Sequence, residues 1–480
     1  MSRVLVRDLA VVVTVDARDT VLRDVSVLVE DGVITAIGPG AGSGVVDGSG
    51  AVGLDVEVGG DGGTGGDGDV VIDGRGHLAL PGLVNLHTHL PMTLLRGIAE
   101  GVDLQGFLER VWAAEGAVMD PSTVELGATL GALESLLGGC TTQLDMYFHH
   151  EAAHRGAVAA GSRHVGGPTF FDGPGPDGLV WEERVAGLRA WPEELRRAGG
   201  PQVPVAAMPH STYTCSVQHV ADVARVLAEV TDPTAGLAPV LHTHVSENAA
   251  ENADLATRLA ATPTELLAAA GVLGGATAGP VGPRPRVVAG HGVHLSATDR
   301  ALLAQSDATV AHCPGSNLKL ASGALDWEQW RADGIRLGIG TDGCASSNDL
   351  DMWQAMRQAA HLAALTSGRP DIAATTVLRA ATIDGARALG MEHLVGSLEV
   401  GKRADLVLLD LEQPHLTPVH DVPALLVHAA GRADVSHVLV DGRIVVSERR
   451  STLLDTSELL GRCRSRARDA AAAVLAAQEA

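Results

Sequence analysis

Positive charge is scarce in this 480-residue sequence. It carries 35 basic residues against 58 acidic residues, which gives a formal net charge of -23. A surface of this composition has no excess of cations to neutralise phosphates, so binding to nucleic acid or to an anionic membrane has no electrostatic support. Only two of the basic residues are lysines, Lys319 and Lys402. The composition therefore favours a protein whose partners are small molecules.

The sequence also lacks paired cysteines and long apolar runs. None of its five cysteines stands in a Cys-x-x-Cys pair, which argues against a disulfide framework and a structural zinc site. No stretch approaches the roughly 18 uninterrupted apolar residues of a membrane span. The amino terminus has no signal-peptide pattern, because Arg3, Arg7 and Asp8 interrupt its apolar residues. We therefore expect a cytoplasmic protein with reduced thiols.

Both ends of the chain have the pattern of β-strands. In residues 1–78 and 396–450, runs of β-branched residues are separated by glycine and aspartate turn signals, which predicts a small β-sandwich domain built from the two ends. Residues 39–69 are glycine-rich and predict a flexible surface insertion, because ordering glycine costs much conformational entropy. Residues 451–480 predict a carboxy-terminal helix.

The intervening residues 79–395 alternate between short apolar strands and helical stretches rich in alanine and leucine, the pattern of βα units. The expected strands are VNLHTHL, TTQLDMYF, RHVGGPTFF, VPVAAMPHS, PVLHTHVSE, RVVAGHGVH, ATVAHCPGSN and RLGIGTDG. Each ends in polar residues, as expected where functional groups gather at the carboxyl ends of barrel strands. Eight such units predict a closed (β/α)8 TIM barrel rather than an open sheet.

Polar side chains at the ends of three of these strands have the chemistry of a metal site. His87 and His89 stand two residues apart on the first strand, so both imidazoles project from the same face. His244 ends the fifth strand and Asp342 ends the eighth. Alone, each of these residues is as readily interpreted as an ordinary hydrogen-bonding group. Together they predict one divalent metal ion with a coordination position left for water.

Longer motifs around these residues resemble a known family. HTHLPMTLLRG, HVSE, AGHGVHL, HCPGSNLKLASG and GTDGCASSNDLDMW are similar to motifs of the amidohydrolase superfamily, in particular its 5'-methylthioadenosine/S-adenosylhomocysteine deaminases and related aminohydrolases. The resemblance covers essentially the whole chain. It implies that the four side chains named above bind one zinc ion, or sometimes iron. It also implies that Glu247 and His291 act on the substrate.

The positions of the two lysines bear on the number of metal ions. Binuclear relatives usually bridge their two ions with a carboxylated lysine at the end of strand four, where this sequence offers only Met208 and His210. Lys319 follows the seventh strand and Lys402 lies in the carboxy-terminal β-segment. We therefore predict a single ion, for which imidazole and carboxylate ligands suit zinc and also accept iron.

The resemblance leads to a hypothesis of hydrolytic deamination. Metal-bound hydroxide attacks the amino-bearing carbon of a nitrogen heterocycle, and ammonia leaves. Asp342 takes and returns the proton, Glu247 protonates a ring nitrogen, and His291 stabilises the oxygen of the tetrahedral intermediate. The plainer interpretations are a helix-start carboxylate for Glu247 and a hydrogen-bonded histidine for His291. His242 and His294 are interpreted as supporting or structural histidines.

Three residues are candidate substrate contacts: His210, Trp112 and Asn317. His210 resembles a family position that contacts the substrate. Asn317 follows the seventh strand with His312 and Ser316, and this segment is equally well interpreted as a polar turn. All four phenylalanines and both tyrosines fall between residues 107 and 213, where their rings could stack on a planar substrate or simply pack between helix and strand.

One departure from the family concerns the substrate. Family nucleoside deaminases carry a glutamate after strand one that binds the ribose hydroxyls, whereas Gly106 stands at that position here. Asp103 or Glu109 could replace it only in a shifted loop. Our leading hypothesis is a homo-oligomeric aminohydrolase of an adenosine-like compound. The alternatives are an amino- or chlorohydrolase of a triazine, pterin or free purine, and a barrel that has lost catalysis and serves as a scaffold.

Overall fold

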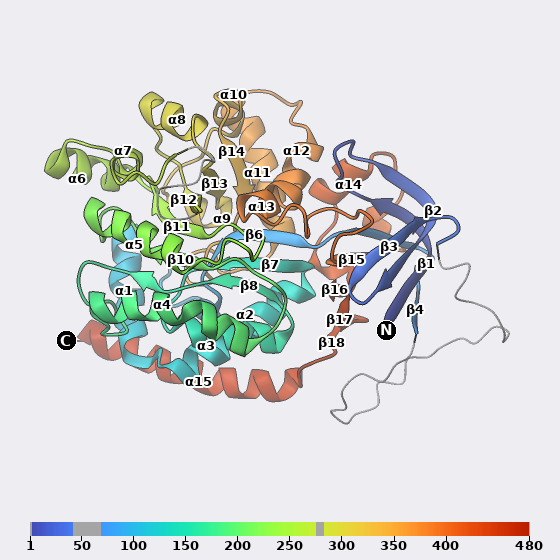
Figure 1. Cartoon of the computed structure of the whole chain (residues 1–480), viewed down its shortest axis with the longest axis horizontal. Coiled ribbons are helices and arrows are strands. Elements are labelled where there is room, and N and C mark those ends of the chain that lie inside the picture. Colours follow the sequence, from blue (N-terminus) through green and yellow to red (C-terminus); the bar gives the residue numbers. More distant parts are fainter. Residues whose placement is uncertain (1, 42–68, 275–282, 480) are drawn as a thin grey trace.

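The structure of the chain is a computed structural model that describes residues 2–41, 69–274 and 283–479. The glycine-rich insertion predicted at 39–69 therefore lies, from residue 42 to residue 68, outside the described residues. The fold is of the α/β class, with parallel sheets. Figure 1 shows the βα part of the chain beside a region that consists mostly of strands.

Two parallel sheets form the interior of the βα part. One has the order β14-β13-β12-β11-β10-β9, and the other has the order β6-β7-β8. Their strands are β6 (Leu83–Thr88), β7 (Cys140–Asp145), β8 (Arg163–Gly166), β9 (Thr169–Phe170), β10 (Ala206–Pro209), β11 (Val240–Val245), β12 (Arg286–His291), β13 (Thr309–His312) and β14 (Arg336–Ile339). Every residue of β6, β7 and β11 is buried, as expected for parallel strands covered on both faces.

All eight predicted strands are present, but the third is divided into two. β8 pairs with β7, whereas β9 pairs with β10, so the chain passes between the sheets at Gly167 and Pro168. A Cβ atom on Gly167 would lie 1.9 Å from the carbonyl oxygen of Ala206, and proline has no N–H for a strand ladder. The prediction of one continuous strand over RHVGGPTFF was therefore wrong.

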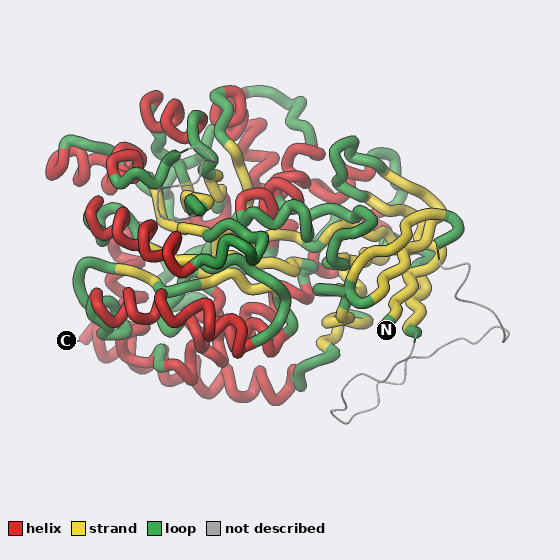
Figure 2. The backbone as a smooth tube through the Cα atoms, viewed as in Figure 1, coloured by secondary structure: helices red, strands yellow, loops and turns green. Residues whose placement is uncertain are grey.

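Helices surround these strands, as the red and yellow segments of Figure 2 show. They are α1 (Leu104–Val118), α2 (Pro121–Leu137), α3 (His150–Ala160), α4 (Trp181–Ala198), α5 (Val217–Val230), α6 (Ala249–Leu259), α7 (Pro263–Ala269), α8 (Ala297–Ala304), α9 (Pro314–Lys319), α10 (Trp327–Ala332), α11 (Met352–Ser367), α12 (Ala374–Ala380) and α13 (Ile383–Ala388). Capping explains where several of them begin. The Asp120 side chain accepts a hydrogen bond from the Thr123 amide at 2.8 Å, and Pro121 takes the first position of α2.

Strands from both chain ends pair in a further, nine-stranded sheet. Its order is β18-β17-β16-β15-β5-β1-β2-β3, and β4 also pairs with β1. The strands are β1 (Arg3–Val13), β2 (Val21–Glu30), β3 (Val33–Gly38), β4 (Val70–Asp73), β5 (His77–Pro81), β15 (Leu406–Asp410), β16 (Val435–Val440), β17 (Arg443–Ser447) and β18 (Arg450–Ser451). Pairing of β5 with β15 joins the two ends of the chain and continues to Pro81. Short helical segments η2 (Pro414–Leu416), α14 (Val422–His428) and η3 (Arg432–Asp434) connect β15 to β16.

The carboxy-terminal helix α15 (Thr456–Glu479) lies along the outside of the βα part (Figure 1). It packs against α1, α2 and the 3-10 helix η1 (Leu90–Leu95) that follows β6. Leu459 and Cys463 of α15 pack with Leu94, Leu126 and Leu133. None of the described helices is long and apolar enough to cross a membrane.

A buried ion pair connects β8 to the start of β15. Two nitrogens of Arg163 contact the two carboxylate oxygens of Asp405 at 2.9 and 3.0 Å. The two side chains are 0% and 1% exposed. Loss of Arg163 would leave the Asp405 carboxylate buried without a cation, which is far more destabilising than leaving a solvated carboxylate unpaired.

We predict that Arg163→Met lowers the free energy of unfolding by about 3–5 kcal/mol, because it leaves Asp405 buried without its cation. Urea denaturation measures the change. The control is Arg155→Met, which removes an ion pair with Glu125 whose side chains are 50% and 45% exposed. It should cost no more than about 1 kcal/mol. Equal losses in the two variants would contradict the importance of the buried pair.

Candidate metal centre and active site

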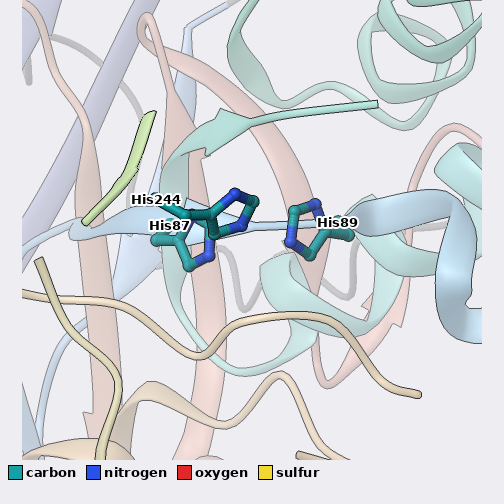
Figure 3. A group of neighbouring side chains, drawn as sticks. All are labelled: His87, His89 and His244. Carbon is teal, nitrogen blue, oxygen red and sulfur yellow. The ribbon is translucent and has the colours of Figure 1, made fainter. Parts of the chain in front are cut away.

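Three histidines converge at the carboxyl ends of the parallel strands. His87 lies on β6, His89 directly follows it, and His244 lies on β11. One nitrogen of each ring lies within 4.8 Å of the corresponding nitrogens of the other two. Figure 3 shows the three rings gathered between the strands. His87 and His89 are two residues apart in the sequence, and their imidazoles lie beside each other, as this spacing predicts.

A carboxylate and a fourth imidazole adjoin these rings. Asp342 follows β14, and its Oδ1 atom lies 3.2 Å from His89 Nε2 and 3.5 Å from His87 Nε2. His87, His291 and Asp342 form a second group whose ligand atoms lie within 4.8 Å of one another. The structure therefore brings together all four side chains predicted as metal ligands, with His291 beside them.

Backbone carbonyls orient two of the imidazoles. His89 Nδ1 lies 2.6 Å from the carbonyl oxygen of Met146, and His244 Nδ1 lies 2.7 Å from that of His210. A carbonyl oxygen only accepts, so Nδ1 carries the proton in both rings. Asp342 beside His89 raises the pKa of that ring to about 9, although burial opposes the rise, so a bound ion would take the place of the proton on His89 Nε2. In the neutral rings each Nε2 keeps a lone pair, which is the form that binds a metal ion.

His87 reaches the same state through a second histidine. His242 Nδ1 donates to the carbonyl oxygen of Val288 at 2.8 Å, so its Nε2 accepts a proton from His87 Nδ1 at 2.7 Å. Burial lowers the pKa of His87 to about 4 and holds that of His242 well below its usual value, so both rings are neutral. His87 Nε2 is buried and has no hydrogen-bond partner among the described residues. Three such lone pairs beside a carboxylate fit a divalent metal ion.

The backbone at these strand ends is unusual. Ser246, His291 and Asp342 have φ angles of 49°, 72° and 62°, the left-handed region that residues other than glycine seldom adopt. Gly340 lies so close to β6 that a Cβ atom there would be 2.8 Å from His87 Cβ. The sequence motifs contain these residues, but their pattern gave no signal of the strain.

A cavity that is partly open to solvent lies beside the convergent side chains. It is lined by His89, Met92, Leu104, Phe107, Leu108, Val111, Trp112, Glu115, Met146, Tyr147, Phe148, Thr169, His210, Tyr213, His244, Glu247, His291, Leu320 and Asp342. Two of the predicted substrate contacts, His210 and Trp112, are therefore placed at the cavity. Trp112 is the more exposed of the two, and its ring lies edge-on to His210 with centroids 6.1 Å apart.

Glu247 and His291 face one another at this cavity. Glu247 Oε2 lies 3.8 Å from His291 Nε2, and both side chains are buried. Burial raises the pKa of Glu247, which favours its protonated form. The other ring nitrogen of His291, Nδ1, is 3.0 Å from Asn317 Oδ1. This contact fixes the direction in which His291 presents Nε2.

The contact between Asn317 and His291 also bears on one prediction. Asn317 was expected to contact the substrate, but it is not among the described residues that line the cavity. Helix α9, which carries Asn317, begins directly after β13. The Asn317 side chain therefore contacts Nδ1 of His291 at the end of β12, on the side of the ring away from Nε2. His294 Nε2 bonds to the carbonyl oxygen of Ser322 at 2.6 Å, a structural contact. The Lys319 amino group bonds to Glu100 and Asn348.

Sequence reasoning missed one acidic residue of the cavity. Glu115 on α1 is buried, and its Oε1 accepts a hydrogen bond from the Tyr147 hydroxyl at 2.7 Å. The acidic residues considered instead lie elsewhere on the same helix. Asp103 caps α1 by accepting from the Gly106 amide, and Glu109 is exposed and bonded to Gln105. The available signal was the position of Glu115, four residues after Val111, on the buried stripe of α1.

Comparisons with known proteins agree with this arrangement. A model of the amidohydrolase family matches residues 78–445. The chain belongs to the amidohydrolase family. It is accordingly a hydrolase, and the resemblance inferred from its motifs is confirmed.

Relatives of this amidohydrolase match over nearly their full lengths. The chain is 37% identical to the 5-methylthioadenosine/S-adenosylhomocysteine deaminase of Moorella thermoacetica, over 90% of this chain and 97% of that protein. It is 33% identical to the 5'-deoxyadenosine deaminase of Methanosarcina acetivorans, over 98% of both. A solved adenosine deaminase of Xanthomonas campestris with bound zinc superposes with a TM-score of 0.83, 32% identity and 98% coverage of each chain.

We predict that His242→Phe weakens zinc binding by about 10- to 100-fold, because His87 loses the acceptor that fixes its proton on Nδ1. Competition with a chelator of known affinity measures the change. His294→Phe is the control, since His294 bonds to a carbonyl outside the convergent group. Unchanged zinc affinity in the His242 variant would contradict its role in orienting His87.

We further predict that Gly340→Ala reduces both metal content and thermal stability. The added Cβ would lie 2.8 Å from His87 Cβ and 3.0 Å from its backbone nitrogen and oxygen, and backbone atoms cannot yield without moving β6. Overpacking of this kind costs about 1–3 kcal/mol. Gly173→Ala, where a Cβ meets no atom within 4 Å, should leave both properties unchanged. Metal analysis and thermal unfolding of the two variants provide the measurement.

Proposed function

We propose that this amidohydrolase deaminates an amino-substituted nitrogen heterocycle of the adenosine type, with release of ammonia. The observation that carries the proposal is the convergence of three imidazole lone pairs and the Asp342 carboxylate beside the Glu247–His291 pair in one cavity. The relatives named as 5-methylthioadenosine/S-adenosylhomocysteine and 5'-deoxyadenosine deaminases support the substrate class. A scaffold that has lost catalysis would have no need to keep all six side chains together.

The ligands of the proposed metal ion are His87, His89, His244 and Asp342. Zinc is the ion that we favour, since imidazole with one carboxylate suits it and a solved relative contains it; iron would also be accepted. A bound divalent ion supplies a water nucleophile at neutral pH, because it lowers the pKa of that water. We propose one ion, because both lysines of the chain are held elsewhere.

Three side chains of this protein then carry out the proton transfers of the reaction. Asp342 accepts a proton from the attacking water and returns it to the departing amine. Glu247, whose pKa is raised by burial, donates a proton to a ring nitrogen and makes the amino-bearing carbon more electrophilic. Asn317 Oδ1 accepts the Nδ1 proton of His291 and so leaves a lone pair on Nε2, which accepts a hydrogen bond from the hydroxyl on the reacting carbon. The proton of that hydroxyl then replaces the one that Glu247 has donated.

The walls of the cavity account for recognition of a planar ring. Trp112, Phe107, Phe148 and Tyr213 offer aromatic faces or edges there. We propose that His210 contacts the substrate as well. It follows β10, stacks on Phe171 with centroids 5.0 Å apart, and holds His244 through its carbonyl oxygen. Substrate and metal ligand are thereby linked through one residue.

We also propose that the two parallel sheets close into one (β/α)8 barrel. Contacts at both places where the two sheets adjoin, between β14 and β6 and between β8 and β10, support closure. The Asp342 amide, beyond β14, donates to the His87 carbonyl of β6 at 2.9 Å, and the Met208 amide of β10 donates to the carbonyl of Pro168 at 2.9 Å. In this organisation residues 79–395 form the barrel, and residues 1–78 and 396–450 form the β-domain. The pairing of β5 to Pro81 supports a boundary close to residue 79.

The expected cytoplasmic location and homo-oligomeric state stay predictions. All five cysteines are free and buried, which accords with a reducing compartment. Sedimentation of the purified protein would establish the number of subunits.

We predict that Glu247→Gln retains the metal ion but lowers kcat by about 10²- to 10⁴-fold, the usual contribution of a positioned general acid. The measurement is ammonia release from adenosine, 5'-methylthioadenosine, adenine, a pterin and an aminotriazine, together with metal analysis. Glu265→Gln is the control, because glutamine preserves the capping box of α7. A near-normal rate in the Glu247 variant would rule out proton donation by this residue.

The unmodified protein tests the function itself. We expect about one equivalent of metal and the greatest kcat/KM on an adenosine-type compound. Less than a small fraction of an equivalent, with no ammonia from any compound, would favour a scaffold. Faster release from the triazine or the pterin would move the assignment to that ring.

A further inference from the structure

Glu115 stands out because it is a carboxylate in an otherwise largely apolar wall. It lies on α1, and the same helix contributes Leu104, Phe107, Val111 and Trp112 to the cavity. The Glu115 side chain lines that cavity, and the residue is only 3% exposed. Its Oε1 atom is paired with the Tyr147 hydroxyl, whereas Oε2 has no hydrogen-bond partner among the described residues.

A carboxylate in this position is costly unless something else contacts it. Burial of a charged or polar atom without a partner costs several kcal/mol or forces the group to become neutral. Burial raises the pKa of Glu115 to about 7, although the hydrogen bond from Tyr147 opposes the rise. Among the described residues, no arginine or lysine forms an ion pair with Glu115 to offset the cost. The fold alone therefore gives no reason to keep an acid here.

The surroundings of Glu115 direct it towards a ligand. Tyr147 is the residue after Met146, whose carbonyl oxygen holds His89, so Glu115 and a proposed metal ligand are positioned by consecutive residues of one segment. The proton donor Glu247 comes from a different element, the segment after β11. A substrate with its amino-bearing carbon near the metal ligands can thus meet Glu247 with one part and Glu115 with another.

We propose that Glu115, positioned by Tyr147, is a specificity-determining residue that accepts a hydrogen bond from an N–H or O–H group of the substrate away from the reacting carbon. The proposal rests on the deaminase function proposed above. It deepens that function by requiring a donor-bearing substrate. The donor has two chemically equivalent sources, the hydroxyls of an attached sugar and a ring N–H of a free base.

Other acids near the start of α1 do not compete for this role. Asp103 uses its Oδ1 to cap the helix, at 3.0 Å from the Gly106 amide. Glu109 is exposed and accepts from Gln105 at 3.1 Å. Because Glu109 lies on the same helix and carries the same group outside the cavity, Glu109→Gln is a matched control for Glu115→Gln.

The test uses zinc-loaded wild-type protein and the two variants with two pairs of compounds. Adenosine and 2',3'-dideoxyadenosine differ in the sugar hydroxyls, and adenine and 9-methyladenine differ in a ring N–H. We expect the wild type to prefer the donor-bearing member of one pair by about 10- to 100-fold in kcat/KM, as for a hydrogen bond to a charged group. That pair identifies the source of the donor. In Glu115→Gln the preference should fall to near unity, because the Tyr147 hydroxyl keeps the amide oxygen and an NH2 group, which cannot accept a hydrogen bond, replaces Oε2.

Binding of the deaminated products separates this proposal from the deaminase function. Calorimetry gives Kd for inosine, 2',3'-dideoxyinosine, hypoxanthine and 9-methylhypoxanthine, none of which needs turnover. If no compound releases ammonia, the deamination proposal is wrong, and the ratios of Kd still decide the role of Glu115. A wild type without preference in either pair, or a preference that persists in Glu115→Gln, overturns the proposal.

Metal content and thermal unfolding show whether the variants fold. Should Glu115→Gln fail to fold, Glu115→Asp replaces it, since this variant keeps the charge but withdraws the carboxylate by one methylene. It should lower the same ratio, and an unchanged ratio overturns the proposal. Glu109→Gln should keep the wild-type preference, and loss of preference in that variant would also overturn it.

Discussion

The main physical constraint on this molecule is the burial of several imidazoles and one carboxylate within a few ångströms of each other. Their lone pairs face a common space because each Nδ1 proton is committed to an acceptor behind it, at Met146, His210 or His242. Without a cation, Asp342 pairs only with His87 and His89, at 3.5 and 3.2 Å, and the remaining lone pairs are desolvated. Binding of the proposed metal ion would therefore be coupled to folding of this part of the chain.

This constraint extends into the backbone. The segment after β14 must approach His87 closely for Asp342 to reach the proposed metal ion. Gly340 permits this approach because it has no Cβ. His291 and Asp342 adopt left-handed φ angles at the ends of their strands, which turns their side chains towards the cavity. Strain of this kind persists only where the surrounding packing enforces it. The buried strands β6, β11 and β12 supply that packing.

Sequence patterns predicted the strand ends well because polar residues after a buried strand are both visible in the sequence and placed together by a parallel sheet. His87, His244 and Asp342, which the structure brings together, were predicted in this way. Features that depend on close contacts between distant segments, or on which face of a helix a residue occupies, were harder to predict. The break between β8 and β9 depends on the close approach of Gly167 to Ala206, which is a contact between distant segments. Asn317 follows a strand like a site residue, yet the helix that begins there turns it behind His291.

Glu115 shows a further limit and how it could be overcome. Alignment with family motifs directed attention to Gly106, but the periodicity of α1 places Glu115 with Phe107 and Val111 on the buried stripe. An acidic residue on the buried face of a helix is itself a sign of a functional role. The position of Glu115 also implies that the proposed reactive groups lie at the strand ends, whereas α1 contributes an apolar wall with a single acidic residue. Helix α1 packs against α15 on the outside of the βα part. We therefore expect substitutions on α1 to affect the proposed choice of substrate more than the geometry of the proposed metal ligands.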